Sequence, residues 1–282
     1  MKPPERLRPL LEEGLIDSVQ RQLMSGKEAM VFVVESAGAT ICAKVYKEAT
    51  QRGFRQATHY TENRKTKSSR NARAMAKGSR FGKRSVESAW QSAEVDALFR
   101  LAAAGVRVPK PLQFHEGVLL MELVCDAEGN AAPRLADLKF TPEEARRYHA
   151  TLILEVVRML VAGLVHGDLG EFNILMGAEG PVIIDLPQAV DAAGNQHAAG
   201  LLARDVANLR NYFGRFAPEL LTTDYGRELW AVYETGLLRV DSKLTGYFEE
   251  SEVPVDLEQM LAVIEDAKED EAERRQRLQD RG

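Results

Sequence analysis

The first residues of the chain alternate apolar and charged positions at a spacing close to that of a helix, with Gly14 in the middle. A glycine inside such a pattern marks a break. We therefore predict two short amphipathic helices, which form an N-terminal helical extension over residues 1–24. Their apolar positions are Leu7, Leu10, Leu11, Leu15, Ile16, Val19 and Leu23.

Short runs rich in β-branched and other apolar residues follow. Residues 30–36 (MVFVVES) and 40–47 (TICAKVYK) flank a turn that contains Gly38, which predicts an antiparallel strand pair. A further strand is expected at 117–124 (GVLLMELV). Residues 51–85 show neither the periodicity of a helix nor that of a strand, so we predict a flexible insertion there. This insertion would lie within an N-terminal lobe over residues 25–124.

Helical periodicity dominates the second half of the chain. A helix predicted from Ser85 stops at Gly105, and a second begins at Thr141, where Thr141, Pro142 and Glu144 form a capping sequence. Further helices are expected over residues 197–214, 217–239 and 256–279, and a small hairpin on both sides of the turn at 177–180. The predicted fold is α+β and two-lobed, with a mainly helical C-lobe over residues 125–248 and an acidic C-terminal helix or tail over 249–282.

The net charge of the chain is only -5, but the charged residues are distributed unevenly along it. Residues 51–85 carry eleven Lys and Arg against one acid, a local net of +10, whereas residues 249–282 carry twelve acids against five bases, a net of -7. The two cysteines, Cys42 and Cys125, lie in apolar runs and are expected to be buried thiols. No signal peptide or membrane span is predicted, so we expect a cytoplasmic protein with no membrane partner.

Three oxygen-bearing side chains suggest phosphoryl transfer. In HGDLGEFN (166–173), Asp168 can orient or deprotonate an acceptor hydroxyl, and Asn173 can ligate magnesium without adding charge. Twelve residues later, Asp185 closes the apolar run VIID. Two Asp and one Asn in such an apolar context are costly unless they have a function, so we predict that Asn173 and Asp185 hold a metal beside catalytic Asp168.

Upstream residues supply the matching cations. Alternation along 40–47 places Lys44 on the opposite face from Ala43 and Val45. Glu94, in the middle of the next predicted helix, is its expected ion-pair partner and would fix the lysine against ATP phosphates. The turn before residue 30 contains Ser25, Gly26 and Lys27, where the glycine permits close backbone approach and the other two can donate to phosphate oxygens.

Together these segments resemble the RIO family of atypical serine/threonine protein kinases, from about residue 15 to about residue 215. The resemblance rests on SGKEA (25–29), AKVYK (43–47), the helix with Glu94, the strand VLLMELV, HGDLGEFNIL (166–175) and IIDLPQAV (183–190). It implies a small protein-kinase fold without an activation loop. ATP and Mg²⁺ are the implied cofactors, with Mn²⁺ as an alternative metal.

The resemblance also implies a role for each matching residue. Asp168, Lys44 and Asp185 are the implied catalytic residues, with Asn173 and Asp185 as metal ligands. The nucleotide would bind Ser25, Gly26, Lys27, Lys44, Glu94 and the hinge residues Met121, Glu122 and Leu123. The implied activity is autophosphorylation or phosphorylation of a protein substrate, or mainly ATP hydrolysis, with autophosphorylation sites in the basic insertion and Asp185 as a further phospho-acceptor.

Two features depart from the family pattern. Gly170 stands where many members have a serine, and only 24 residues precede the catalytic region, so we expect no N-terminal winged-helix domain. The short N-terminus resembles that of bacterial members. A role in ribosome maturation, which the eukaryotic and archaeal members have, therefore does not transfer directly.

Two other functions are compatible with parts of the pattern. Aminoglycoside and choline kinases share HGDLxxxN and a later Asp, but they place a large helical substrate lobe after that Asp, and only 97 residues follow Asp185 here. Alternatively, the chain is an ATP-switched factor that contacts RNA or the ribosome through the basic insertion.

Overall fold

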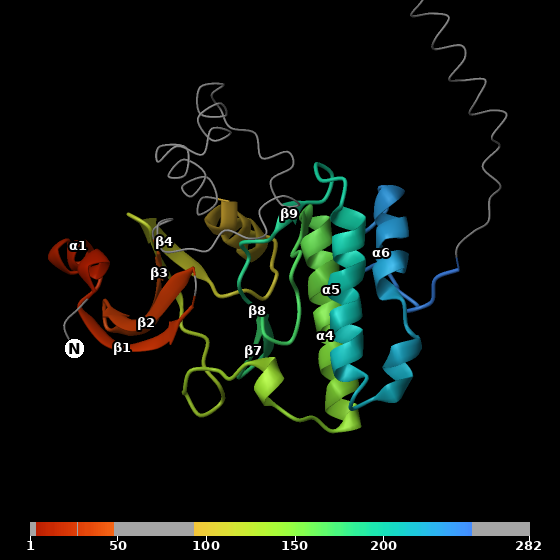
Figure 1. Ribbon diagram of the computed structural model, residues 1–282, viewed down its shortest axis with the longest axis horizontal. Helices are drawn as coiled ribbons and strands as arrows, with labels where there is room; N and C mark the ends of the chain where they lie inside the picture. The colour runs from red at the N-terminus through yellow and green to blue at the C-terminus, as the bar shows by residue number, and fades with distance from the viewer. Residues whose placement is uncertain (1–3, 27, 48–92, 250–282) are drawn as a thin grey trace, which may run out of the picture. The chain divides into compact units, whose positions relative to one another are not determined.

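A five-stranded antiparallel sheet forms the N-terminal part of the computed structural model, which describes residues 4–26, 28–47 and 93–249 (Figure 1). The strand order is β1-β2-β3-β5-β4. The strands are β1 (Ser18–Ser25), β2 (Ala29–Ser36), β3 (Ala39–Tyr46), β4 (Pro111–His115) and β5 (Val118–Glu122). The predicted strand pair and the strand at 117–124 are thereby confirmed, while the insertion 51–85 and the helix predicted over 256–279 lie outside the described residues.

The two faces of this sheet have different partners. Ala43 and Val45 are fully buried and pack with Leu7 and Leu10 from η1 (Glu5–Leu7) and α1 (Arg8–Glu12). Tyr46 packs on the opposite side, in the larger cluster that contains the helix over residues 93–103. Strand alternation therefore turns Lys44 away from α1 and toward the C-terminal part, as predicted.

The prediction of a second N-terminal helix is wrong, because residues 18–25 form the edge strand β1. Its pairing with β2 is irregular between Val19 and Arg21 and again between Gln22 and Met24. Each irregularity shifts the inward and outward positions by one residue, so the sequence loses the two-residue period of a strand and takes on a helix-like spacing. The predicted boundary between extension and N-lobe at residues 24 and 25 falls inside this strand.

The C-terminal part is mainly helical and lies on the other side of β7 (Ile174–Gly177) and β8 (Gly180–Ile183) from the sheet (Figure 1). It contains α4 (Pro142–Val161), α5 (Ala198–Phe213) and α6 (Tyr225–Glu234), which pack against one another. Both halves of the capping box at the start of α4 are present, since Thr141 and Glu144 each bond to the other's backbone nitrogen.

The single helix predicted over 217–239 is divided. It consists of η4 (Pro218–Thr222) and α6, because Thr223 is extended and the Asp224 side chain caps α6 at the nitrogen of Arg227. Two small two-stranded sheets lie in the segment between α4 and α5. One is the hairpin of β7 and β8, as predicted. The other pairs β6 (Leu164–Val165) with β9 (Val190–Asp191), which precede and follow that hairpin in the chain, and the sequence did not indicate it.

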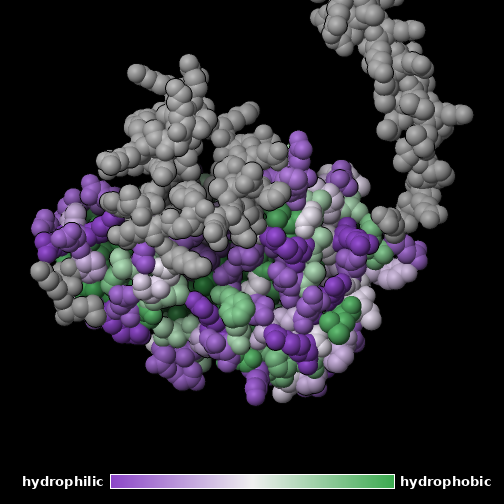
Figure 2. All heavy atoms as spheres, viewed as in Figure 1, coloured by the Kyte–Doolittle hydropathy of each residue, from purple (hydrophilic) through white to green (hydrophobic). Residues whose placement is uncertain are grey.

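Hydrophilic side chains cover most of the visible face of the described residues, and hydrophobic ones appear there in small separate groups (Figure 2). The described residues up to Tyr247 belong to one compact unit. Within the described ranges, every helix is too short or too polar to cross a bilayer.

Candidate active site

The loop over residues 166–173 connects β6 to β7 and carries the first two candidate residues. Asp168 is exposed, although Gly167 and Leu169 on either side are buried. The ring of His166 fixes the loop at its start, because Nδ1 accepts the Asp168 N–H at 3.3 Å and Nε2 lies 3.1 Å from the Ile184 carbonyl. Since Nδ1 is an acceptor in this arrangement, Nε2 carries the proton and donates to Ile184.

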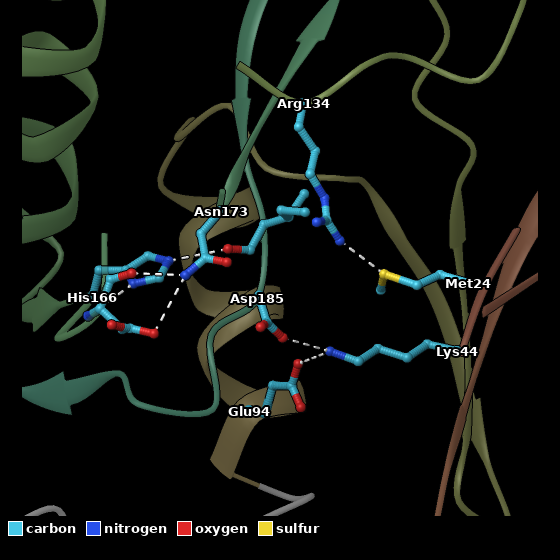
Figure 3. A network of polar contacts seen from close by, with 9 residues as sticks. Met24, Lys44, Glu94, Arg134, His166, Asn173 and Asp185 are labelled. Carbon is cyan, nitrogen blue, oxygen red and sulfur yellow. Dashed lines mark hydrogen bonds and ion pairs between the residues drawn. The ribbon is translucent and has the colours of Figure 1, made fainter. Parts of the chain in front are cut away.

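Asn173 closes the same loop with its side-chain amide. Its Nδ2 donates to the Asp168 carbonyl at 2.7 Å and lies 3.5 Å from the Asp168 carboxylate (Figure 3). These contacts assign the amide nitrogen to the loop backbone. The amide oxygen is thus turned away from Asp168 and is the atom that can ligate a cation.

Asp185 lies two residues after β8 in a strained backbone conformation. Its φ is +66°, a left-handed value that a residue with a side chain seldom adopts. The end of β8 is tied to the loop through the next residue, Ile184, whose N–H donates to the Asn173 carbonyl at 3.0 Å. The left-handed turn then directs the exposed carboxylate of Asp185 toward the sheet, where Oδ1 lies 3.1 Å from the Lys44 ammonium.

Lys44 bridges the two parts of the molecule. Its ammonium lies 2.5 Å from Glu94 and 3.1 Å from Asp185 (Figure 3). The predicted contact between Lys44 and Glu94 is therefore present. Burial opposes the charge on the amine, but the two carboxylates outweigh it and raise the pKa of Lys44. The side chain is therefore a permanent cation at the point where sheet, helix 93–103 and β8 meet.

The predicted phosphate-binding turn lies between β1 and β2. The Gly26 N–H donates to the Ala29 carbonyl at 2.9 Å, which closes the turn. Lys47, at the end of AKVYK, donates its ammonium to the Gly26 carbonyl at 2.6 Å and lies 3.4 Å from the Ser25 hydroxyl. Lys27 lies outside the described residues. The turn is thus anchored to β3 by a lysine that the sequence reasoning did not single out.

The predicted hinge lies at the end of β5. Met121 and Leu123 are both partly buried. The carboxylate of Glu122 forms two hydrogen bonds with Arg107, at 2.8 and 2.9 Å, and accepts the Lys110 N–H at 3.0 Å. The hydrogen bonds from Arg107 lower the pKa of Glu122. Its side chain therefore ties the end of β5 to the segment before β4 and is not available to a nucleotide base, and the Glu122 N–H already donates to the Lys110 carbonyl at 2.8 Å.

Helix α5 supports the loop over residues 166–173 through Asp205, which the sequence reasoning missed. Its carboxylate accepts the N–H groups of Gly167 and Leu169, at 2.7 and 2.9 Å. Arg204 and Asn208 donate to the carbonyls of the same two residues. Burial raises the pKa of Asp205 to about 6. A signal was present, because Asp205 interrupts the apolar stripe of Leu201, Leu202, Val206 and Leu209.

A metal at this site would have few protein ligands. Among the described residues, no group of three or more His, Cys, Asp or Glu side chains is arranged to hold a metal. The Asn173 amide oxygen and the Asp185 carboxylate nevertheless fit magnesium, which commonly binds one or two protein oxygens and completes its shell with phosphates and water. The donor set therefore suits a metal that arrives with a nucleotide.

A model of one family, described as the RIO domain, matches residues 30–225. Among the similar curated proteins, the RIO-type serine/threonine-protein kinase Rio1 of Haloferax volcanii is 36% identical over 73% of this chain and 67% of its own length. The serine/threonine-protein kinase rio1 of Schizosaccharomyces pombe is 31% identical over 74% of this chain and 41% of its own. This chain thus spans less than half of the yeast relative.

The fold has a counterpart among solved structures. The crystal structure of the Rio2 kinase-ADP/Mg²⁺-phosphoaspartate complex from Chaetomium thermophilum matches with a TM-score of 0.50 and 24% identity, over 74% of this chain and 59% of that one. This likeness concerns the fold and confirms the predicted two-lobed, protein-kinase-like architecture.

Proposed function

Because this chain belongs to the RIO family, we propose that it is an ATP- and magnesium-dependent serine/threonine protein kinase. The observation that carries the proposal is the position of Lys44, whose ammonium lies within 3.1 Å of both Glu94 and Asp185. Phosphoryl transfer needs such a cation beside oxygen ligands and an acceptor-orienting carboxylate. The names of the similar proteins, serine/threonine-protein kinases, support the same activity.

Each residue has a defined task in this proposal. Lys44, held by Glu94, binds phosphate oxygens of ATP. The turn that contains Ser25, Gly26 and Lys27 binds the same phosphates. The base lies against Met121, the main chain of Glu122, and Leu123. Asn173 and Asp185 would hold the magnesium ion, which neutralises phosphate charge when bound.

Asp168 acts on the acceptor. It orients the acceptor hydroxyl and takes its proton, while the hydroxyl oxygen bonds to the γ-phosphorus and the bond between that phosphorus and ADP breaks. The exposed position of Asp168 between two buried neighbours leaves its carboxylate accessible to a protein substrate. The same geometry serves autophosphorylation or hydrolysis, in which water replaces the hydroxyl.

Family membership favours this function over a small-molecule phosphotransferase. The basic insertion that suggested RNA or ribosome contact lies outside the described residues, so that contact stays a prediction. The same is true of a cytoplasmic location, of Mn²⁺ as an alternative metal and of the bacterial-type assignment. The similar proteins named above come from an archaeon and a fungus, which gives the bacterial assignment no support.

The test is to incubate the purified chain with γ-labelled ATP and magnesium and to follow the label. We expect label on the protein or on free phosphate, and loss of at least about a hundredfold in rate for Asp168→Asn with ADP binding retained. Hydroxylamine distinguishes the acceptors, because it releases phosphate from an aspartyl phosphate at Asp185 but not from phosphoserine. Unlabelled protein and phosphate in the wild type, or an Asp168→Asn variant with unchanged rate, would contradict the proposal.

A further inference from the structure

Arg134 enters the candidate active site from the segment that follows the hinge. Its side chain extends from the upper loop toward the space that Lys44, Asp185 and Asn173 border (Figure 3). The guanidinium Nη2 lies 2.9 Å from the sulfur of Met24 on β1. One side chain thus reaches from the C-terminal part to the strand that precedes the phosphate-binding turn.

The backbone of Arg134 is fixed to strand β7. Arg134 pairs with Leu175 in an isolated β-bridge, two residues after Asn173. On one side, the Pro133 carbonyl accepts the Met176 N–H at 2.8 Å; on the other, the Ala136 N–H donates to the Glu171 carbonyl at 3.0 Å. The backbone from which the guanidinium extends is therefore fixed relative to the strand that follows Asn173.

The contact with Met24 leaves most of the binding capacity of Arg134 unused. A guanidinium has five N–H donors in a planar fork, whereas a thioether is a weak acceptor. In the described part of the chain, the Arg134 guanidinium forms no ion pair and no other hydrogen bond. Met24 is itself 41% exposed, so the contact is not part of a packed core.

We propose that Arg134 is a nucleotide-binding residue, whose guanidinium leaves Met24 and binds phosphate oxygens of ATP or ADP from the side opposite Lys44. This inference rests on the proposed function, because it places the nucleotide in the same cleft. Two cations would then flank the phosphates, Lys44 from β3 and Arg134 from the segment after the hinge. A planar fork matches a pair of phosphate oxygens better than it matches a sulfur atom.

The affinity of ADP relative to adenosine tests the inference, because the two ligands differ only in the phosphates. Isothermal titration in the presence of magnesium would compare the wild type with Arg134→Gln and Arg134→Lys. We expect Arg134→Gln to weaken ADP binding about tenfold and to leave adenosine binding within about twofold, since one charge-assisted phosphate contact is lost. The ADP affinity of Arg134→Lys should lie between those of the wild type and Arg134→Gln, because lysine keeps the positive charge but lacks the planar fork of donors.

The control is Arg147→Gln on α4, where the guanidinium is exposed and lies over the ring of Tyr148. It removes the same charge from the outer surface and should leave ADP binding unchanged. Thermal unfolding without nucleotide verifies that each variant is folded. Equal ADP affinity in wild type and Arg134→Gln, or an equal loss for ADP and adenosine, would overturn the inference, whereas a wild type that binds no ADP would contradict the proposed function itself.

Discussion

The ammonium of Lys44 lies 2.5 Å from the carboxylate of Glu94, although fifty residues separate the two in the chain. Glu94 is only 4% exposed, so its charge is compensated mainly by this lysine. Asp185 contacts the same ammonium from the opposite part of the molecule. The orientation of Lys44 therefore depends on the balance between a buried and an exposed carboxylate.

Removal of the buried carboxylate should shift that balance. In Glu94→Gln, Lys44 keeps only Asp185, so we expect phosphoryl transfer to slow by about tenfold or more and stability to fall by about 2 kcal/mol. Urea unfolding and the labelled-ATP assay measure the two effects. The same substitution at Glu128, on an exposed turn, is the matched control. Unchanged transfer in Glu94→Gln would show that the ion pair does not position Lys44.

Gly26→Ala separates nucleotide binding from folding. Among the described atoms, a Cβ at this position would meet only the Ala29 carbonyl, at 3.5 Å, an ordinary contact, and the backbone needs no left-handed φ there. We therefore expect unchanged thermal stability but weaker ADP binding, by about tenfold, because the methyl group occupies the path by which phosphates approach the turn.

Gly200→Ala on α5 is the control for this substitution. Among the described atoms, a Cβ there meets none within 4 Å, and the residue lies in a helix away from the turn. It should leave ADP binding unaltered and raise stability by up to about 1 kcal/mol. Equal ADP affinity in Gly26→Ala and wild type would remove Gly26 from the binding site.

Asp205 should give the stability of the chain a distinct pH dependence. Its folded pKa of about 6 lies above that of an ordinary Asp, so the native state binds the proton more readily than the unfolded chain. Its contribution to stability is then fully present below about pH 4 and is lost as the pH rises through about 6. Between these pH values, the contribution of Asp205 to the free energy of unfolding falls by roughly 2–3 kcal/mol.

Comparison with Asp205→Asn isolates this contribution, because all other titrations are shared. We expect the stability difference between wild type and variant to change by roughly 2–3 kcal/mol between pH 4 and pH 7, in favour of the wild type at low pH. Urea unfolding at several pH values measures it. A difference that stays constant with pH would contradict the raised pKa.

The candidate site residues that lie in local sequence motifs were predictable. Asp168, Asn173 and Asp185 each stand at a fixed place in a short segment, and the alternation of β3 determines the side on which Lys44 lies. The start of α4 was also determined locally, by Thr141 and Glu144.

Long-range contacts were not predictable in the same way. Asp205 reaches the catalytic loop from 36 residues away, and Arg134 contacts Met24 from 110 residues away. No periodicity encodes such contacts, which arise only when the two parts pack together. Strand β1 was missed for a different reason, since its irregular pairing removes the two-residue period that identifies a strand.

A crystal structure of the chain with magnesium and a non-hydrolysable ATP analogue tests the central claim most directly. We expect a magnesium ion at about 2.0–2.1 Å from oxygens of both Asn173 and Asp185, with Lys44 on the phosphates and Asp168 facing the γ-phosphate. A nucleotide bound elsewhere, or a metal that contacts neither Asn173 nor Asp185, would contradict the account.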